Sequence, residues 1–225
     1  MRDRSLVRLR VRPGTNYLSS GRTVLATDDN GILAPELDRG LFVHETRLLS
    51  RYRWLIDGEP PQPVSASNVS QRAWLGYFIA TAKGGPVEKQ RDPISAAAQE
   101  AVELRLSRYL GGGMHEDVDV TNFARWPIEL KLSLELESDF ADQSETGGDR
   151  QQHGEQSATW APGDQVRELR TTYEAEHRYD HQGDVGGAKI RRGLTVRFLN
   201  FTSPPEHEND RILFRISLAP HERWH

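Results

Sequence analysis

A regular alternation of apolar and polar residues runs through the segment 128–137. Its apolar positions are Ile128, Leu130, Leu132, Leu134 and Leu136. A period of two predicts a strand that is buried on one face. Burial of each aliphatic side chain is worth about 1.5–3 kcal/mol before entropy. A shift of the pairing by one residue would expose all five, so the register of this strand is strongly specified.

The same alternation recurs along the chain and predicts strands within 6–11, 17–27, 48–56, 74–82, 102–110, 118–120, 166–175, 194–201 and 212–218. Turn signals separate them, among them Asp28–Gly31, Asp57-Gly58 and Gly111–Gly113. No segment has a convincing amphipathic helical pattern. The chain is therefore predicted to be all-β, a single large antiparallel β-sandwich (supersandwich-like) over residues 1–225, with about eleven to thirteen strands.

Two polar segments interrupt this pattern. Residues 141–163 are rich in Gln, Glu, Gly and Ser and contain almost no aliphatic residues. Because strands resume afterwards, this segment is predicted to be a mobile insertion within the single domain. Residues 180–189 are predicted to be a glycine-rich loop.

The stretch from Gly40 to Gly58 is the most informative part of the sequence. Its second half alternates like a half-buried strand, and Asp57-Gly58 supplies residues that suit a turn. Before that strand, four polar residues follow one another from His44 to Arg47, next to Phe42 and Val43. This is more polarity than a core strand needs.

This stretch resembles the opening signature of the N-terminal domain of bacterial glycogen-debranching-type (amylo-α-1,6-glucosidase-like) proteins. That signature runs Gly-Leu-Phe, Asp-Thr-Arg, Leu-Ser and then an aromatic strand ending in Asp-Gly or Asn-Gly. Here the triplet is Glu45-Thr46-Arg47, with a longer acid. Further similar blocks lie at 103–110, 114–118, 122–123 and 139–142, so the resemblance covers residues 16–142 well and the remainder loosely.

The resemblance implies a β-sandwich packed against a helical (α/α) barrel that carries the catalytic acids. No helical pattern of barrel length exists in this sequence, so no catalytic residue is assigned to it. The chain is expected to be a non-catalytic domain that docks on the barrel and helps to shape an α-glucan cleft. The residues expected at the interdomain interface are His44, Glu45, Arg47, Asp139 and Asp142.

The same acids also have structural interpretations. Asp139 and Asp142 could cap a strand-to-loop corner through backbone N–H groups, and Glu45 could form an ion pair with Arg47 that orders the loop. Glu116 and Asp117 could lie on the rim of a hairpin. A pair of carboxylates suitable for glycoside hydrolysis cannot be recognised among 33 acidic residues.

Tryptophan residues are the other candidates for contact with carbohydrate. An exposed indole offers a flat apolar face beside a polar rim, which suits a sugar ring. Trp54 and Trp74 are predicted to belong to the core. Trp126, beside Pro127, and Trp160, in the polar insertion, are the candidate carbohydrate-binding residues.

Composition narrows the classes of function. The net charge is −4, and Arg residues are interleaved with Asp and Glu, which argues against nucleic acid as a partner. The chain lacks Cys, a membrane-span-length apolar run and a signal-peptide core, so a soluble cytoplasmic protein is expected. No cofactor or metal is expected. The strongest metal-like cluster, Glu174, Glu176, His177, Asp180 and His181, is better interpreted as a solvated hairpin end.

Two alternatives remain at the level of sequence. The chain could be a free-standing carbohydrate-binding or assembly module, or an enzyme complete in itself that uses Glu45 or Asp139. A sheet face built to dock on a barrel should leave an exposed apolar patch, so the isolated chain is expected to self-associate.

Overall fold

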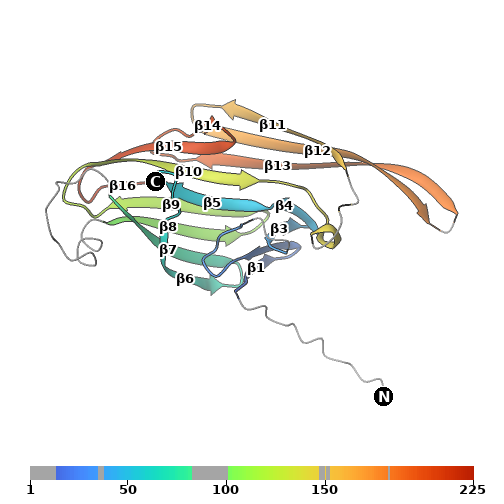
Figure 1. Cartoon of the computed structure of the whole chain (residues 1–225), viewed down its shortest axis with the longest axis horizontal. Helices are drawn as coiled ribbons and strands as arrows, with labels where there is room; N and C mark the ends of the chain where they lie inside the picture. Colours follow the sequence, from blue (N-terminus) through green and yellow to red (C-terminus); the bar gives the residue numbers. More distant parts are fainter. Residues whose placement is uncertain (1–13, 35–37, 83–100, 147–149, 151–152, 182) are drawn as a thin grey trace, which may run out of the picture.

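The structure, a computed structural model, describes residues 14–34, 38–82, 101–146, 150, 153–181 and 183–225 (Figure 1). Strands dominate these residues, and their only helical element is the 3-10 turn η1, Gln143–Glu145. The predicted all-β fold is confirmed. The strand predicted within 6–11 lies outside the described residues.

The described residues form strands labelled β1 to β16, more than the eleven to thirteen expected, because several pairings involve very short segments. They are β1 (Asn16–Ser20), β2 (Thr23–Thr27), β3 (Gly40–Val43), β4 (Thr46–Leu49), β5 (Arg51–Ile56), β6 (Gln62–Ser70), β7 (Ala73–Thr81), β8 (Ala101–Leu110), β9 (Met114–Asn122), β10 (Ile128–Glu137), β11 (Gly154–Pro162), β12 (Val166–His181), β13 (Asp184–Leu199), β14 (Glu206–Glu208), β15 (Arg211–Leu218) and β16 (Arg223–Trp224).

The strands form four antiparallel sheets. Sheet A has the order β1-β2-β3-β4, sheet B has β14-β15-β10-β5, sheet C has β16-β9-β8-β7-β6, and sheet D has β11-β12-β13. The strands run along the long dimension of the molecule (Figure 1). The register of β10 follows its alternation, since Ile128 pairs with Leu218 and Leu134 with Ile212 in β15.

One hydrophobic core joins these sheets, as expected for a sandwich. It contains the apolar faces of sheets B and C together with residues of sheet A. Leu132 of sheet B and Leu104 of sheet C are fully buried in it. Sheet D covers part of sheet B, where Phe198 of β13 lies edge-on to Phe214 of β15 with ring centroids 6.0 Å apart.

Sheet A connects sheet C to sheet B at one end of the molecule. The amide of Ser19 in β1 donates to the carbonyl of Gln71 in the β6–β7 turn at 2.9 Å. On the other side, Thr46 in β4 forms a bridge with Asp142, just after β10. The single strand predicted within 48–56 is therefore divided between two strands, because Ser50 separates β4 in sheet A from β5 in sheet B.

The structure differs from the expected polar insertion at 141–163. Residues 154–162 of this segment form β11, an edge strand of sheet D whose side chains are exposed except for the half-buried Trp160. Its polarity follows from exposure on both faces. The prediction of a glycine-rich loop at 180–189 is also wrong. Asp184–Ile190 belongs to β13 of sheet D and pairs with β12 in a long hairpin that extends beyond the other sheets (Figure 1).

Candidate functional site

A tight two-residue turn joins β3 to β4 and carries two of the residues that the sequence singled out. Val43 pairs with Thr46, which leaves His44 and Glu45 as the turn residues, and both are exposed. Their φ angles are +48° and +68°. This is the left-handed region that a two-residue hairpin turn requires and that Asn and Gly occupy more easily.

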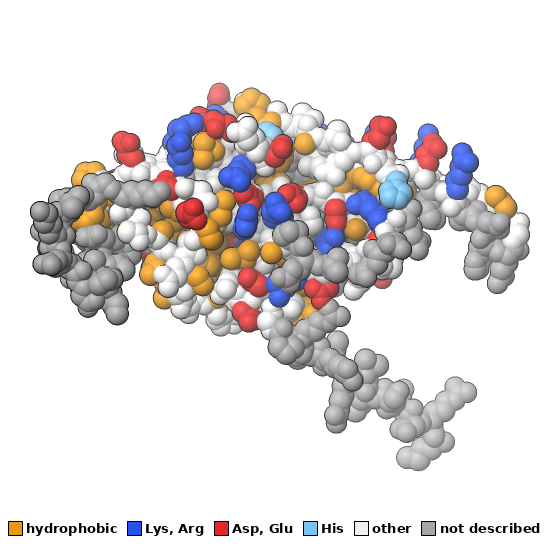
Figure 2. Space-filling model, viewed as in Figure 1, with side chains coloured by type: hydrophobic (Ala, Val, Ile, Leu, Met, Phe, Trp, Pro, Cys, Tyr) orange, Lys and Arg blue, Asp and Glu red, His pale blue; other side chains and the backbone are white. Residues whose placement is uncertain are grey.

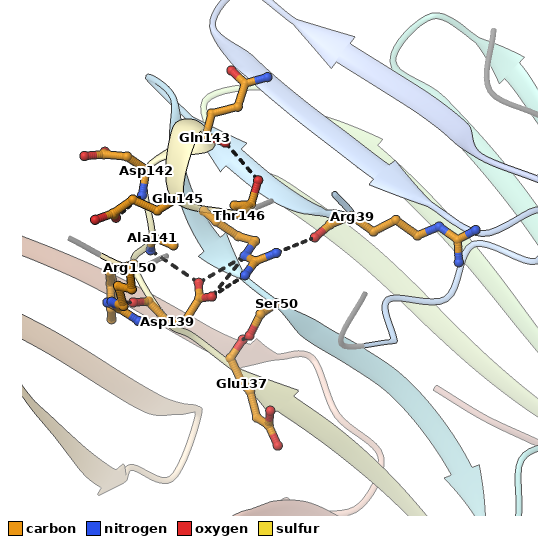
Figure 3. A network of polar contacts seen from close by, with 12 residues as sticks. Arg39, Ser50, Glu137, Asp139, Ala141, Asp142, Gln143, Glu145, Thr146 and Arg150 are labelled. Carbon is orange, nitrogen blue, oxygen red and sulfur yellow. Dashed lines mark hydrogen bonds and ion pairs between the residues drawn. The ribbon is translucent and has the colours of Figure 1, made fainter. Parts of the chain in front are cut away.

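Arg47 follows this turn and reaches the segment after β10. Its Nε donates to both carboxylate oxygens of Asp139 at 3.1 Å, and its Nη2 also donates to Asp139. Its Nη1 donates to the carbonyl of Arg39 at 3.3 Å (Figure 3). Arg47 thus forms an ion pair with Asp139, and the ion pairs found among the described residues do not include one between Glu45 and Arg47.

The segment from Asp139 to Thr146, together with Arg47, forms what we call the corner. Phe140 has a φ of +53°, is fully buried, and stacks on Tyr173 with ring centroids 5.6 Å apart. The amide of Ala141 donates to Asp139 Oδ1 at 3.4 Å, as the capping interpretation of Asp139 expected. Arg150 donates to the carbonyl of Asp139 (Figure 3).

Asp142 lies at the start of η1 within this corner. Its amide donates to Glu145 Oε2 at 2.9 Å, and its carbonyl accepts the amide of Glu145 at 2.8 Å. Arg192, from β13, donates to Asp142 Oδ1 at 2.6 Å and to the carbonyl of Phe140 at 2.5 Å. The corner is thereby held between sheets A and D.

The structure brings together all five residues predicted for the interdomain interface. Arg47, Asp139 and Asp142 form internal contacts of the corner, whereas His44 and Glu45 stand exposed beside it. A hydrogen bond of 2.8 Å from the amide of Gln143 to the carbonyl of Glu45 joins the turn to η1. Their part in an interdomain interface stays a prediction.

An open groove of about 1120 Å³ lies between this turn, η1 and the outer face of sheet A. Its floor consists of side chains from three neighbouring strands, Tyr17, Val24, Ala26 and Phe42. Its rim carries the charged residues Arg22, Asp38, His44 and Glu45 and the polar residues Gln143, Ser144 and Thr146. We call this the sheet A groove. Sequence reasoning singled out His44 and Glu45 but missed the aromatic floor, whose signal was the exposed Tyr17 and the half-buried Phe42 on two of the strands.

The two tryptophans predicted to bind carbohydrate lie elsewhere. Trp126 and Trp160 are half-buried and pack against the hydrophobic core. The Trp160 ring stacks on His207 at 5.7 Å and lies against Phe198 at 5.9 Å. These contacts occupy much of the indole of Trp160, and neither residue lines the sheet A groove. Their role as carbohydrate-binding residues stays a prediction.

Glu116 is not on a hairpin rim, which corrects one interpretation from the sequence. Its side chain is 3% exposed and accepts three hydrogen bonds in the core. They come from Tyr52 Oη at 2.8 Å, Trp54 Nε1 at 2.8 Å and Arg108 Nε at 2.6 Å. Burial, reinforced by the Glu116 carboxylate, raises the pKa of Tyr52 well above its usual range. This cluster joins sheet B to sheet C.

The acidic and histidine residues of the β12–β13 hairpin form no metal cluster within the described part of the chain. Glu174 pairs with Arg191 at 2.5 Å and Glu176 with Lys189 at 3.6 Å across the hairpin. The side chains of His177, Asp180 and His181 lie outside the described residues. Among the described residues, no helix is long and apolar enough to span a membrane.

Comparison with known proteins assigns the family of the chain. A search of curated proteins gives no match. A family model described as the N-terminal domain of (some) glycogen debranching enzymes matches residues 18–225. The match includes both Gly40–Arg47 and Asp139–Asp142, the segments that build the turn and the corner, so the chain belongs to the family of N-terminal domains of glycogen debranching enzymes.

Proposed function

We propose that this chain is the non-catalytic N-terminal β-sandwich of a glycogen-debranching-type glycoside hydrolase, which packs on a helical catalytic barrel and helps to shape an α-glucan cleft. The family match over residues 18–225 is the observation that carries this proposal. The chemistry of the signature acids supports a non-catalytic role, since Asp139 and Asp142 are engaged by Arg47 and Arg192.

The end of the sandwich formed by sheet A is the surface we assign to the catalytic barrel. The exposed turn residues His44 and Glu45 stand there on a rigid support, because the corner fixes η1 against β4. Charged groups of both signs are interspersed on the face seen in Figure 2. At the sheet A end, the groove rim also carries both signs of charge, from Arg22, Asp38, His44 and Glu45. Such a polar surface suits an interface between domains, which is more polar than an obligate protein–protein interface.

The first test measures binding between this chain and an (α/α)-barrel glucosidase domain encoded in the same or a neighbouring gene. By titration calorimetry, His44→Ala should weaken binding by about tenfold, because it removes an exposed side chain of the assigned surface. His115→Ala is the matched control, since this histidine side chain is 65% exposed at the β8–β9 hairpin, outside that surface.

Failure of this chain to bind any such barrel would contradict the proposal and favour a free-standing carbohydrate-binding or assembly module. Hydrolysis of a branched α-glucan by the chain alone, abolished by Glu45→Gln or Asp139→Asn, would also contradict it and would show an enzyme complete in itself. We expect no hydrolysis by the isolated chain.

The docking proposal also predicts the solution behaviour of the chain without its barrel. A sheet face built to dock on a barrel should leave an exposed apolar patch, so the isolated chain should self-associate as its concentration rises. Light scattering after gel filtration measures this. A constant monomer mass at high concentration would count against an extensive apolar docking face.

A further inference from the structure

We propose that the sheet A groove is an α-glucan-binding site in which Tyr17 and Phe42 contact sugar rings and His44 and Glu45 bind hydroxyl groups. This inference rests on the proposed function and assigns the part of the domain that touches glucan. It places that contact on the aromatic floor of the groove rather than on Trp126 or Trp160.

The floor of the groove has the shape and the chemistry for sugar rings. Tyr17 is 46% exposed and pairs with Ala26, while Val24 pairs with the half-buried Phe42, so the floor crosses three strands. Two strand spacings across the sheet and two residues along β2 separate the aromatic residues by about 12 Å. This leaves room for more than one sugar ring, whose C–H faces pack on aromatic rings while their hydroxyl groups point to the rim.

The rim of the groove is polar without a dominant sign of charge. Arg22 and His44 offer N–H groups, with Arg22 Nη1 and His44 Nδ1 3.3 Å apart. Glu45 offers a carboxylate, and the amide of Gln143 adds a donor and an acceptor. A phosphorylated ligand would need a net positive rim, and an amphipathic helix would need a larger apolar floor. A neutral polyhydroxylated chain uses both donors and acceptors.

The turn between β3 and β4 adds an independent observation. His44 and Glu45 both adopt positive φ at positions where Asn-Gly would be more stable. Backbone strain of this kind persists where the surrounding structure fixes it, and it gathers at ligand sites. Both strained residues line the groove. The sequence keeps two functional side chains at the place where the hairpin is least suited to them.

The groove wall is held in place before any ligand arrives. The amide of Gln143 donates to the carbonyl of Glu45 at 2.8 Å, and Thr146 Oγ1 donates to the carbonyl of Gln143 at 2.9 Å (Figure 3). Beneath them, Arg47 is clamped by Asp139. A site whose side chains are already positioned loses less entropy on binding.

Affinity electrophoresis of the chain in gels containing glycogen tests this site, with soluble maltoheptaose as competitor and cellohexaose as the linkage control. Wild type should be retarded and released by maltoheptaose. Tyr17→Ala should weaken the apparent affinity by about tenfold, because it removes an exposed ring of the floor. Glu45→Gln should weaken it severalfold by removing a charged acceptor. Tyr109→Ala is the matched control, since Tyr109 is 43% exposed at the end of β8 and lies outside the groove lining.

Three outcomes would overturn the site. They are no retardation of wild type, unchanged retardation of Tyr17→Ala and Glu45→Gln, or loss of retardation in Trp126→Ala or Trp160→Ala with the groove variants intact. None of them affects docking on the barrel, which His44→Ala tests separately without glucan. Weaker barrel binding by Tyr17→Ala, with normal glycogen retardation, would instead show that the groove seats protein.

Discussion

Two Arg–carboxylate pairs in this molecule have the same chemistry and different surroundings. Arg108 and Glu116 have side chains 2% and 3% exposed in the core, whereas Arg47 and Asp139 are 10% and 25% exposed in the corner. The inner pair connects strands β8 and β9 to β5 of the opposite sheet. The outer pair connects β4 to the loop that walls the sheet A groove.

The inner pair has further contacts with two aromatic rings and a backbone carbonyl. The Arg108 guanidinium lies 4.9 Å from the Trp74 ring and 5.3 Å from the Tyr52 ring, and it donates to the carbonyl of Gly31 at 2.7 Å. A buried ion pair contributes little net stability, but removal of one partner leaves an uncompensated charge in the interior. The inner pair therefore specifies how the sheets fit together, whereas the outer pair positions a surface loop.

The largest effect should come from Glu116→Gln. This change leaves the Arg108 charge buried and places amide N–H groups against the donors of Tyr52 and Trp54. We expect a loss of about 3–5 kcal/mol in the free energy of unfolding. The midpoint of urea unfolding measures it.

Glu174→Gln supplies the control for this loss. Glu174 pairs with Arg191 on the exposed β12–β13 hairpin, where an ion pair is worth about 0–1 kcal/mol. The double change Arg108→Met with Glu116→Leu should recover much of the loss, because it removes both charges together. Equal effects of Glu116→Gln and Glu174→Gln would mean that the inner pair does not specify how sheets B and C fit together.

A smaller and more local effect should follow Asp139→Asn. Arg47 keeps the Arg39 carbonyl as a partner and the Asp139 side chain is 25% exposed, so the expected loss is about 1–2 kcal/mol. Hydrogen exchange should quicken at the amide of Gln143, which depends on the corner for its bond to Glu45. Glu137→Gln is the control, since Glu137 lies two residues earlier, at the end of β10, and pairs with Arg51. Unchanged exchange at Gln143 would separate the corner from the groove wall.

The sequence predicted the fold well where one face of a strand carries aliphatic residues. In β10 the alternating residues Ile128, Leu130, Leu132 and Leu134 are buried as expected, although Leu136 is only half-buried and Ser133 and Glu135 are buried as well. β8 and β9 pair around Gly111–Gly113 as expected. The inner pair was missed although its signal was present. Arg108 has the same parity as Leu104 and Leu106, and it faces Glu116 across the ladder. A charge of each sign at paired inward positions indicates a buried ion pair.

The site could be predicted only in part. Signature residues 44–47 and 139–142 pointed to this end of the domain, because polar residues beside a strand are informative by themselves. The groove floor depends on which strands become neighbours, and β1 meets β3 only through β2. Alternation cannot supply that order. The strand β11 was missed because an edge strand exposed on both faces carries no period-two pattern.

The cluster around Glu116 also predicts a dependence of stability on pH. Burial raises the pKa of folded Tyr52, whereas an unfolded tyrosine loses its proton near pH 10. Above that pH the unfolded state binds fewer protons than the folded state, so stability falls as pH rises. Tyr52→Phe should cost about 1 kcal/mol below that pH and make the alkaline decline shallower. Urea midpoints between about pH 8 and 11 measure both effects.

Tyr109→Phe is the matched control, because it removes a phenol oxygen at the end of β8, outside the cluster around Glu116. An equally steep decline in Tyr52→Phe and wild type would show that the phenol of Tyr52 does not control alkaline stability.

The smallest expected change has the opposite sign and separates the groove from the rest of the molecule. His44→Asn with Glu45→Gly installs the residues that a two-residue turn with positive φ prefers, so stability should rise by about 1 kcal/mol. Retardation in glycogen gels should fall, because both side chains line the groove. A stabilised variant that still binds glycogen would mean that the strain has no part in ligand contact. A destabilised variant would mean that the contact between Arg22 and His44 outweighs the strain, which would make the turn a structural feature like the corner.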